Sequence, residues 1–218
     1  MSIFKSIRIA ALTCTTITST TVVAQSATIE KLVVAGGCFW CVESDFESVN
    51  GVVEAVSGFS GGQSANPTYK QVSRGGTGHV EAVEITYDAD IVSHERLIHL
   101  FLRSIDPTDA GGQFCDRGDP YKTAIFYADA AEKDTVLAEI AEAEKTLGKS
   151  VVTRVEPVGA FYAADSGHQD YYKGSKVVLT RFGPKKQSEA YKRYRNACGR
   201  DARVKALWGN DAPFANKY

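Results

Sequence analysis

The 218-residue sequence contains one methionine, Met1, which fits a protein that works among oxidants that attack thioethers. It has no excess of positive charge: lysine and arginine number 25, and aspartate and glutamate 26. A concentrated basic face for nucleic acid or an anionic membrane is therefore not indicated. Hydrophobic residues make up 44% and charged residues 23%, which excludes a disordered chain and a coiled coil. The length suits one domain with a core that needs no disulfides.

Residues 1–24 differ from the rest of the chain. Lys5 and Arg8 give a positive start, residues 9–24 carry no charge, and Val22-Val23-Ala24 places small residues at a cleavage-site spacing. This pattern is typical of a secretory signal peptide, and the stretch is too short and threonine-rich for a membrane-spanning helix. An uncleaved tail is the alternative. We expect an exported, periplasmic protein, with residues 25–218 forming a single domain that ends in a helical tail over about 185–218.

The part after residue 24 has four cysteines at uneven spacings: Cys38, Cys41, Cys115 and Cys198. Uneven spacing argues against a disulfide framework. No second close pair matches Cys38 and Cys41, as a zinc site would require, and the four histidines show no metal-binding spacing. The cysteines therefore indicate redox or nucleophilic chemistry, with no metal.

Hydrophobic periodicity predicts alternating strands and helices. Strands are expected over residues 29–35, 52–59, 79–88, 122–127 and 151–158, and helices over 38–49, after Ser93, and from Asp129 to Gly148. Residues 60–78 and 106–121 are rich in turn-forming residues and are expected to be loops. The order βαββα followed by βαβ predicts an α+β fold. We expect a two-layer α/β sandwich with a ferredoxin-like core and a mixed, mostly antiparallel sheet.

Cys38 lies where a predicted strand ends, Gly36-Gly37 turns the chain and a helix begins. Free N–H groups and the helix dipole at such a junction stabilise a thiolate, so we predict a lowered pKa and a nucleophilic role. A buried, unreactive cysteine is the alternative. Cys41 is one helical turn further on, within the Cα separation that a disulfide requires.

Glu81 is the second candidate. In the strand HVEAVEITY it shares a face with Val83, Ile85 and Tyr87, whereas Glu84 lies on the other face. Burial beside apolar residues favours the protonated carboxyl, which makes Glu81 a candidate general acid; a solvent-exposed carboxylate is the alternative. Three polar residues of the predicted loops are weaker candidates as hydrogen-bonding or orienting groups: Tyr69, Tyr121 and Asp116.

The segment GGCFWCVE, residues 36–43, resembles the active-site signature of the peptide methionine sulfoxide reductase A family. The likeness continues in the family's order through SGFSGG at 57–62, NPTY at 66–69, TGHVE at 77–81, DPT at 106–108 and HQDY at 168–171. It covers about residues 30–172. The sequence departs from the family at Cys41, where many members have glycine, at Phe59, where tyrosine is usual, and at Cys115. The segment after residue 172 also lacks the glycine-rich, two-cysteine end of some members.

The resemblance implies reduction of methionine S-sulfoxide, free and in proteins, with no metal or organic cofactor. Cys38 would attack the sulfur and become a sulfenic acid, a second thiol would form a disulfide with it, and an external dithiol such as thioredoxin would reset the enzyme. The implied residue roles are these: Glu81 as the acid, Tyr69 and Tyr121 at the sulfoxide oxygen, Asp116 in support, and Phe39 and Trp40 around the methyl group.

The resolving thiol is left open by the sequence. Cys41 needs no motion to reach Cys38, so we predict a Cys38–Cys41 disulfide first. Cys198 has basic neighbours that favour a thiolate, and it is the alternative resolver or a relay that passes the disulfide outward. Cys115 ranks third, because the adjacent Asp116 disfavours a thiolate.

Two other functions compete with sulfoxide reduction. A general thiol–disulfide oxidoreductase of the thioredoxin type would use Cys38 and Cys41, but it would need a parallel αβ arrangement and gives Glu81 no role. A non-catalytic binding domain would use the cysteines as structural disulfides. We expect a monomer whose partners are oxidised proteins or free methionine sulfoxide and a thioredoxin-like reductant, with no nucleic acid and no membrane.

Overall fold

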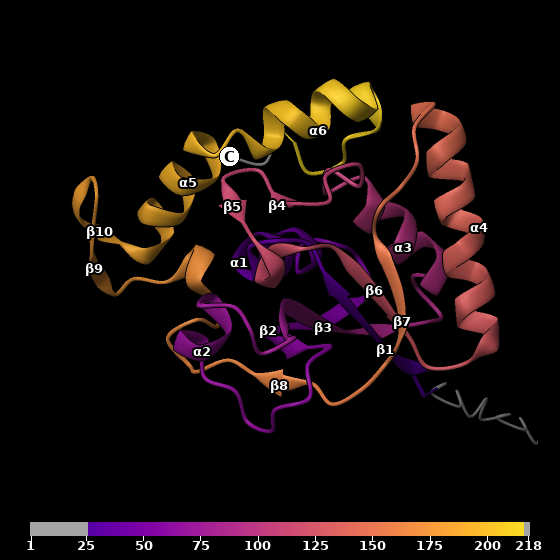
Figure 1. The fold of residues 1–218 in the computed structure, drawn as a ribbon, viewed down its shortest axis with the longest axis horizontal. Helices are drawn as coiled ribbons and strands as arrows, with labels where there is room; N and C mark the ends of the chain where they lie inside the picture. Colours follow the sequence, from indigo (N-terminus) through magenta and orange to yellow (C-terminus); the bar gives the residue numbers. More distant parts are fainter. Residues whose placement is uncertain (1–25, 216–218) are drawn as a thin grey trace, which may run out of the picture.

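A six-stranded sheet forms the centre of the computed structural model, which describes residues 26–215 (Figure 1). The predicted signal peptide lies outside the described residues. The strand order is β7-β6-β1-β3-β2-β8, and neighbouring strands are antiparallel except β6 and β7, which are parallel. The predicted fold class is thus confirmed. The strands are β1 (Ile29–Ala35), β2 (Val52–Ser60), β3 (Val80–Asp88), β6 (Ala124–Tyr127), β7 (Arg154–Pro157) and β8 (Tyr162–Ala163).

Helices α1 (Phe39–Phe46), α3 (His94–Leu102) and α4 (Ala130–Leu147) contribute to the main core, which lies on one face of the sheet. The side chains of Leu32 and Val34 point from β1 into this core. Strand alternation sends Val33 and Ala35 to the other face, where a smaller core is partly covered by Phe161. Helices α3 and α4 begin at polar caps, as predicted: Ser93 Oγ accepts a hydrogen bond from the Arg96 amide, and the Asp129 side chain accepts one from the Glu132 amide.

The predicted loops contain short elements that periodicity did not indicate. Helix α2 (Tyr69–Ser73) lies in the first loop, and β4 (Gly112–Gln113), β5 (Asp116–Arg117) and a 3-10 turn (Asp119–Tyr121) lie in the second. Helix α2 begins with a capping box between Thr68 and Gln71. Five residues are too few for a helical repeat of apolar residues to appear, so only the capping pair could have indicated this helix. The first predicted helix is also shorter than expected and ends at Phe46.

The chain after β8 forms a 3-10 turn (Tyr171–Lys173), a hairpin and two helices. The hairpin strands β9 (Val177–Thr180) and β10 (Gly183–Lys186) project from one end of the molecule (Figure 1). The sequence did not predict this hairpin. Helices α5 (Gln187–Ala197) and α6 (Arg200–Trp208) lie in the region of the predicted helical tail, followed by a 3-10 turn (Gly209–Asp211). None of the described helices is long and apolar enough to cross a bilayer.

Helix α5 is joined to α1 by a buried ion pair. Arg195 is 1% exposed and donates from Nη1 to Asp45 Oδ1 at 2.8 Å, and its Nη2 lies 2.8 Å from Asp201. Removing one partner of a buried pair leaves the other charge without compensation. This ion pair therefore holds the C-terminal helices against the helix that follows Cys38.

We expect Arg195→Met to lower the free energy of unfolding by about 3–5 kcal/mol, because the Asp45 carboxylate would remain buried after losing its ion pair with the Arg195 guanidinium. Urea denaturation followed by circular dichroism measures the change. Lys31→Met is the control, because it breaks the Lys31–Glu84 pair, in which the lysine side chain is 60% exposed. Equal losses of unfolding free energy in the two variants would show that the buried pair stabilises the fold no more than the exposed pair does.

Candidate active site

Cys38 stands between β1 and α1, on the turn made by Gly36 and Gly37. It is the residue that precedes the first helical turn of α1, and the Cys41 amide donates to its carbonyl at 3.1 Å. Gly37 has a φ of +79°, and a Cβ atom there would lie 2.5 Å from Gln113 Cβ. Only glycine fits both the backbone conformation and the space. The predicted strand–glycine–helix junction is therefore present, and it places the Cys38 side chain in the interior with 6% exposure.

Glu81 reaches the same junction from the beginning of β3. Its Oε2 accepts a hydrogen bond of 3.0 Å from the backbone N–H of Phe39, the first residue of α1. The predicted alternation is confirmed: Glu81 is buried with Val83 and Ile85, whereas Glu84 lies on the other face and pairs with Lys31. Burial raises the pKa of Glu81 to about 8, against the opposing effect of the Phe39 hydrogen bond. The carboxyl is thus protonated at neutral pH.

A small pocket brings the predicted site residues together. Its volume is about 100 Å³, and all of the residues predicted for chemistry or substrate binding line it, except the resolving cysteines. Tyr194 of α5 also lines it and was not predicted. The lining residues are Cys38, Phe39, Trp40, Tyr69, Glu81, Asp116, Tyr121 and Tyr194.

Tyr69 and Tyr121 come from the two predicted loops and line the same pocket as Glu81. Their hydroxyl groups hydrogen-bond to each other. Burial, with a further contribution from the Glu81 charge, raises the pKa of both phenols far above neutrality. Both tyrosines therefore keep their protons and remain hydrogen-bond donors at the pocket.

Aromatic rings form the wall on the α1 side. Trp40 stacks on Tyr171 with ring centroids 3.8 Å apart, and His168 lies against Tyr69 at 4.2 Å and Phe39 at 5.5 Å. Burial lowers the pKa of His168, so its ring is neutral and packs like an aromatic group. His168 and Tyr171 were not predicted as site residues, although both belong to the HQDY segment that carries the family resemblance.

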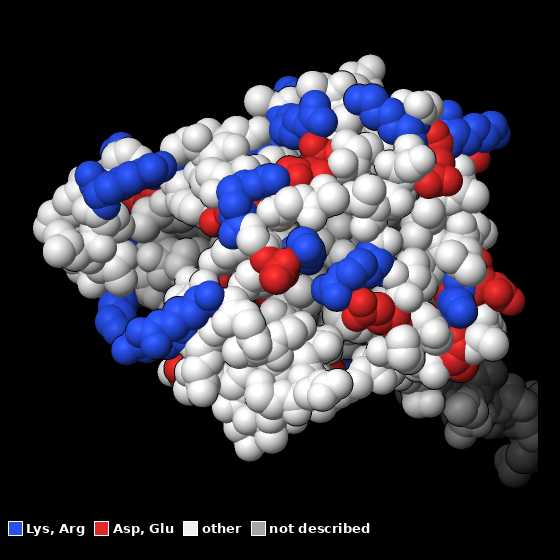
Figure 2. Space-filling view, viewed as in Figure 1, with Lys and Arg blue, Asp and Glu red and all other residues white. Residues whose placement is uncertain are grey.

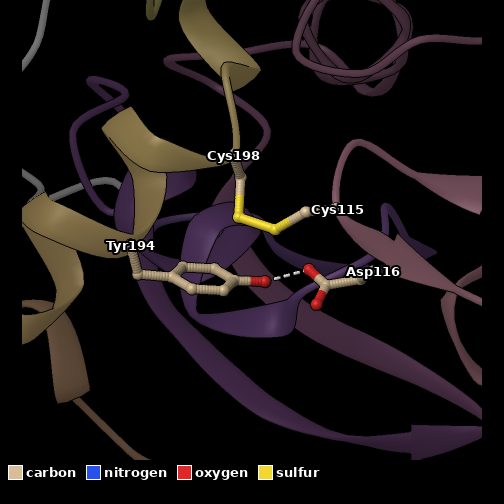
Figure 3. The surroundings of a disulfide bond; sticks show 4 residues. All are labelled: Cys115, Asp116, Tyr194 and Cys198. Atoms are coloured by element: carbon tan, nitrogen blue, oxygen red, sulfur yellow. Dashed lines mark hydrogen bonds between the residues drawn. A yellow bond between two sulfur atoms is a disulfide. The ribbon is translucent and has the colours of Figure 1, made fainter. Parts of the chain in front are cut away.

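A disulfide joins Cys115 and Cys198 near Asp116 and Tyr194, two residues that line the pocket (Figure 3). It joins the β4–β5 turn to the end of α5. One turn earlier in α5, the Tyr194 hydroxyl donates to Asp116 Oδ2. Asp116 is thereby held in two ways: its neighbour Cys115 is in the disulfide, and its own carboxyl accepts the Tyr194 hydrogen bond. Burial raises the pKa of the Asp116 carboxyl. The sequence predicted neither the Cys115–Cys198 pairing nor the Tyr194 contact.

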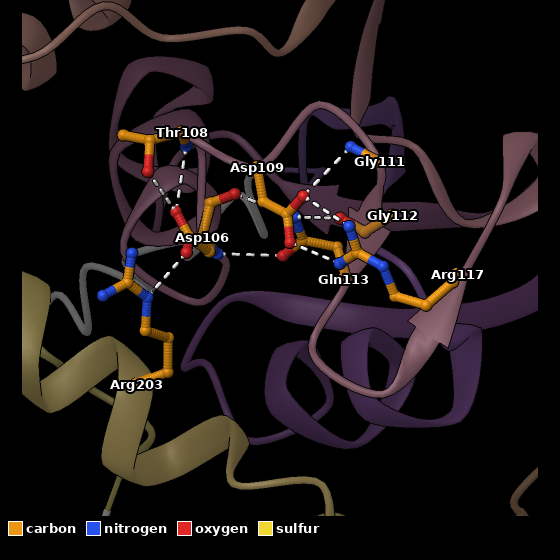
Figure 4. A network of polar contacts seen from close by, with 8 residues as sticks. All are labelled: Asp106, Thr108, Asp109, Gly111, Gly112, Gln113, Arg117 and Arg203. Atoms are coloured by element: carbon orange, nitrogen blue, oxygen red, sulfur yellow. Dashed lines mark hydrogen bonds and ion pairs between the residues drawn. The ribbon is translucent and has the colours of Figure 1, made fainter.

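Polar contacts fix the backbone of the same loop from its other side (Figure 4). The buried Gln113 side chain accepts from the Asp106 amide and donates to the Asp106 carbonyl, each at 2.8 Å. Arg203 of α6 donates to the Asp106 carboxylate at 2.6 Å, and Arg117 pairs with Asp109. These side-chain contacts hold the loop that presents Asp116 and Tyr121 to the pocket.

Cys38 and Cys41 are both free thiols, and they hydrogen-bond to each other. This hydrogen bond, burial and the nearby Glu81 and Asp116 raise the pKa of Cys38. The lowered pKa predicted for Cys38 is thus wrong. The Cys41 pKa is instead lowered to about 7, by the hydrogen bond from Cys38 and by Arg200 and Arg195, although burial opposes it. The helix start favours the Cys38 thiolate, but the hydrogen bond with Cys41, burial and the carboxyl groups of Glu81 and Asp116 outweigh it.

Glu43, Glu47 and Asp170 form an acidic cluster in which one carboxylate oxygen of each residue lies within 4.8 Å of the other two. Lys173 makes ion pairs of 2.8 Å with Glu47 and with Asp170, and so supplies positive charge there. Glu43 accepts hydrogen bonds from the Ser57 hydroxyl and from the Asp170 amide, and burial raises its pKa to about 7. The cluster is an internal polar network that joins α1 to the segment after β8.

Comparison with known proteins identifies the family. The peptide methionine sulfoxide reductase family matches residues 30–210. MsrA 2 of Rhizobium meliloti is 43% identical over 189 residues, which are 87% of this chain and 88% of that protein. MsrA of Bacillus licheniformis is 42% identical, over 80% of this chain and 91% of that protein. The structure of reduced Mxr1 from Saccharomyces cerevisiae aligns with a TM-score of 0.64 at 26% identity, covering 66% of this chain and 84% of that one.

The fold is that of an oxidoreductase, and its pocket brings together a buried thiol, a protonated carboxyl and two phenols. The chain belongs to the peptide methionine sulfoxide reductase family, whose reaction is the reduction of methionine sulfoxide. The antiparallel sheet and the position of Glu81 argue against the thioredoxin-type alternative, which requires a parallel arrangement and gives Glu81 no role.

Proposed function

We propose that the pocket reduces the S epimer of methionine sulfoxide, free and in proteins, by attack of Cys38 on the sulfoxide sulfur. The observation that carries the proposal is the convergence of the Cys38 thiol, the protonated Glu81 and the two phenols on one small pocket. Phe39 and Trp40 line the pocket and provide apolar rings for the substrate methyl group, which is the role that the family resemblance implies for them.

The reduction needs a proton on the sulfoxide oxygen and a thiolate at the sulfur. Glu81 delivers the proton to the oxygen, while Tyr69 and Tyr121 hydrogen-bond to it as its charge develops. The hydrogen bond from Cys38, with Arg200 and Arg195 nearby, lowers the pKa of Cys41, and Cys41 takes the proton of Cys38 as Cys38 attacks. The attack joins the Cys38 sulfur to the substrate sulfur. The hydroxyl group then moves from the substrate sulfur to the Cys38 sulfur while the sulfur–oxygen bond and the new sulfur–sulfur bond both break. Cys38 is oxidised to a sulfenic acid by two electrons, and the substrate leaves as methionine. Asp116 supports Tyr194 and the loop beside the pocket.

The sulfenic acid is then resolved by a second thiol. The Cys41 thiol attacks Cys38, a disulfide forms and water leaves. A thioredoxin-like dithiol reduces this disulfide and becomes oxidised itself, so that no metal or organic cofactor enters the cycle. Cys198 serves as resolver or relay only after its bond to Cys115 is opened. This requirement favours Cys41 as the first resolving residue.

The proposed resolver predicts the product of one turnover. After one equivalent of methionine S-sulfoxide without reductant, peptide mapping by mass spectrometry should find a Cys38–Cys41 disulfide and an intact Cys115–Cys198 link. In Cys41→Ser, trapping with a 1,3-diketone that reacts with sulfenic acids should instead label Cys38, because its neighbouring thiol is gone. A dominant Cys38–Cys198 disulfide, with Cys41 free, would contradict this order of events.

We also propose that the protein is exported, acts in the periplasm and is a monomer. The pattern of residues 1–24 supports export, and the Cys115–Cys198 disulfide supports an oxidising compartment. Cell fractionation and the mass of the mature N-terminus test the location. Light scattering tests the monomer.

Turnover of the separated sulfoxide epimers tests the function as a whole. With dithiothreitol as donor, the S epimer should be reduced to methionine and the R epimer should not. Insulin reduction measured in parallel tests the thioredoxin-type alternative. Insulin reduction without sulfoxide turnover would refute the proposed function.

A further inference from the structure

A second hollow adjoins the active-site pocket. We call it the hairpin groove; it lies between the β9–β10 hairpin, α5 and the stacked rings of Trp40 and Tyr171, and its volume is about 390 Å³. Leu179 and Phe182 of the hairpin line its outer side and are 86% and 40% exposed. A volume of this size is in the range of ligand-binding clefts.

The hairpin groove is continuous with the place where the sulfoxide would bind. Trp40 and Tyr194 line both the groove and the pocket that contains Cys38. A methionine sulfoxide side chain in the pocket would therefore bring its neighbours in the polypeptide to the mouth of the groove, since successive residues of an extended chain are only about 3.3–3.6 Å apart. Free methionine sulfoxide has no such neighbours.

The hairpin carries charge of one sign. Residues 174–188 contain Lys176, Arg181, Lys185 and Lys186 and no acidic residue. None of these four takes part in the ion pairs found among residues 26–215, and Arg181 lies over the Phe182 ring with its Cζ 4.9 Å from the ring centroid. Lys and Arg side chains gather at this end of the molecule in Figure 2. An apolar groove with a basic edge is complementary to an apolar residue followed by acidic ones.

From this geometry we propose that the hairpin groove binds the residues that flank methionine sulfoxide in an oxidised polypeptide. An apolar flanking side chain packs against Leu179 and Phe182, and acidic residues beyond it meet the hairpin charges. The inference rests on the proposed function, because it deepens the substrate class of the same site. Binding in the hairpin groove makes this enzyme selective among oxidised methionines, according to the residues that flank each one.

A protein reductant could also dock on this surface, but continuity favours the substrate. The groove and the pocket share Trp40 and Tyr194 as lining residues, so a chain in the groove lies next to a sulfoxide side chain in the pocket, whereas a reductant has to reach only the sulfur atoms. The two occupants are separated by the choice of donor, because dithiothreitol needs no docking surface.

The test uses the full mature protein, dithiothreitol and three substrates: free methionine S-sulfoxide, a peptide with leucine and two glutamates after the sulfoxide residue, and the same peptide with two lysines. At low ionic strength kcat/KM should be about 10-fold higher for the glutamate peptide than for the lysine peptide, and salt should reduce the ratio. Arg181→Glu should bring the ratio near one. Leu179→Gln should lower kcat/KM for both peptides several-fold.

The controls keep the outcomes distinct. Turnover of free methionine sulfoxide should stay within about twofold in both variants, because neither side chain lines the pocket around Cys38. Lys149→Glu, the same charge change at an exposed site beyond α4, and Ile91→Gln, at a 56% exposed position, should leave the peptide ratio unchanged. Equal effects of Arg181→Glu on all three substrates would overturn the proposal. So would a defect seen only when thioredoxin is the donor, since that would assign the groove to the reductant.

A binding measurement separates this proposal from the reaction itself. Calorimetric titration with the unoxidised methionine forms of the two peptides should show tighter binding of the glutamate peptide, by about fivefold, and loss of that preference in Arg181→Glu. Absence of free methionine sulfoxide turnover in the wild-type protein would refute the proposed function. Equal affinities for the two peptides would refute the groove.

Discussion

Replacement of Cys38 by serine is expected to abolish sulfoxide reduction, with a loss of about 10³-fold or more in kcat even when dithiothreitol is the donor. The reason is that the oxygen must pass to a soft nucleophile at the pocket, and Cys38 is the cysteine that lines it. A serine hydroxyl in the same buried place forms neither a comparable nucleophile nor a sulfenic acid. Single-turnover formation of methionine, measured by chromatography, gives the result.

Cys41→Ser is the matched control for this experiment. It removes a buried thiol one helical turn away, but dithiothreitol reduces a sulfenic acid directly, so single-turnover methionine formation should persist, slowed by loss of the Cys41 base. Multiple turnover with a thioredoxin donor should be lost, because no Cys38–Cys41 disulfide forms. Retention of turnover in Cys38→Ser, or equal loss in both variants, would remove Cys38 from its role as nucleophile.

Replacement of Glu81 by glutamine should lower kcat by about 10²-fold or more, because the amide donates a hydrogen bond but no proton. The pH profile gives the more specific result. Burial raises the pKa of Glu81 to about 8, so the acid is available below that pH and is lost as the pH rises through 8. The wild-type rate should therefore fall on the alkaline side with an apparent pKa near 8. That limb should disappear in Glu81→Gln.

Glu84→Gln provides the comparison for Glu81→Gln. Glu84 is three residues further along the same strand, but it lies on the opposite face and pairs with the exposed Lys31. The same chemical change there should leave both the rate and the alkaline limb unaltered. An unchanged pH profile in Glu81→Gln would show that another group supplies the proton.

The strands and long helices were predictable because their apolar residues repeat over many positions. The same repeat predicted the environment of Glu81. Alternation along β3 correctly placed its side chain with those of Val83 and Ile85 on a buried face of the sheet. The short elements carry no such repeat. The position of Tyr69 at the start of α2 depends on a five-residue helix that only its capping pair could have indicated.

The tertiary contacts of the site were beyond the sequence for a different reason. The Tyr194 hydroxyl meets Asp116 across 78 positions of the chain, and Cys115 joins Cys198 across 83. No local pattern encodes such distances. The direction of the Cys38 pKa shift was predicted wrongly for the same reason. The helix start was visible in the sequence, whereas the burial of the thiol next to Cys41, Glu81 and Asp116 depends on the folded arrangement.

The Cys115–Cys198 disulfide has a further consequence for the covalent structure of the chain. Residues 115–198 form a closed ring that contains the exposed turn at Arg181 and Phe182. A protease that cuts this turn opens the ring but separates nothing, because the piece that ends at Arg181 still holds Cys115 and the piece that begins at Phe182 still holds Cys198. The nicked enzyme stays one molecule, with α5 and Tyr194 tied to the pocket, for as long as the disulfide is oxidised.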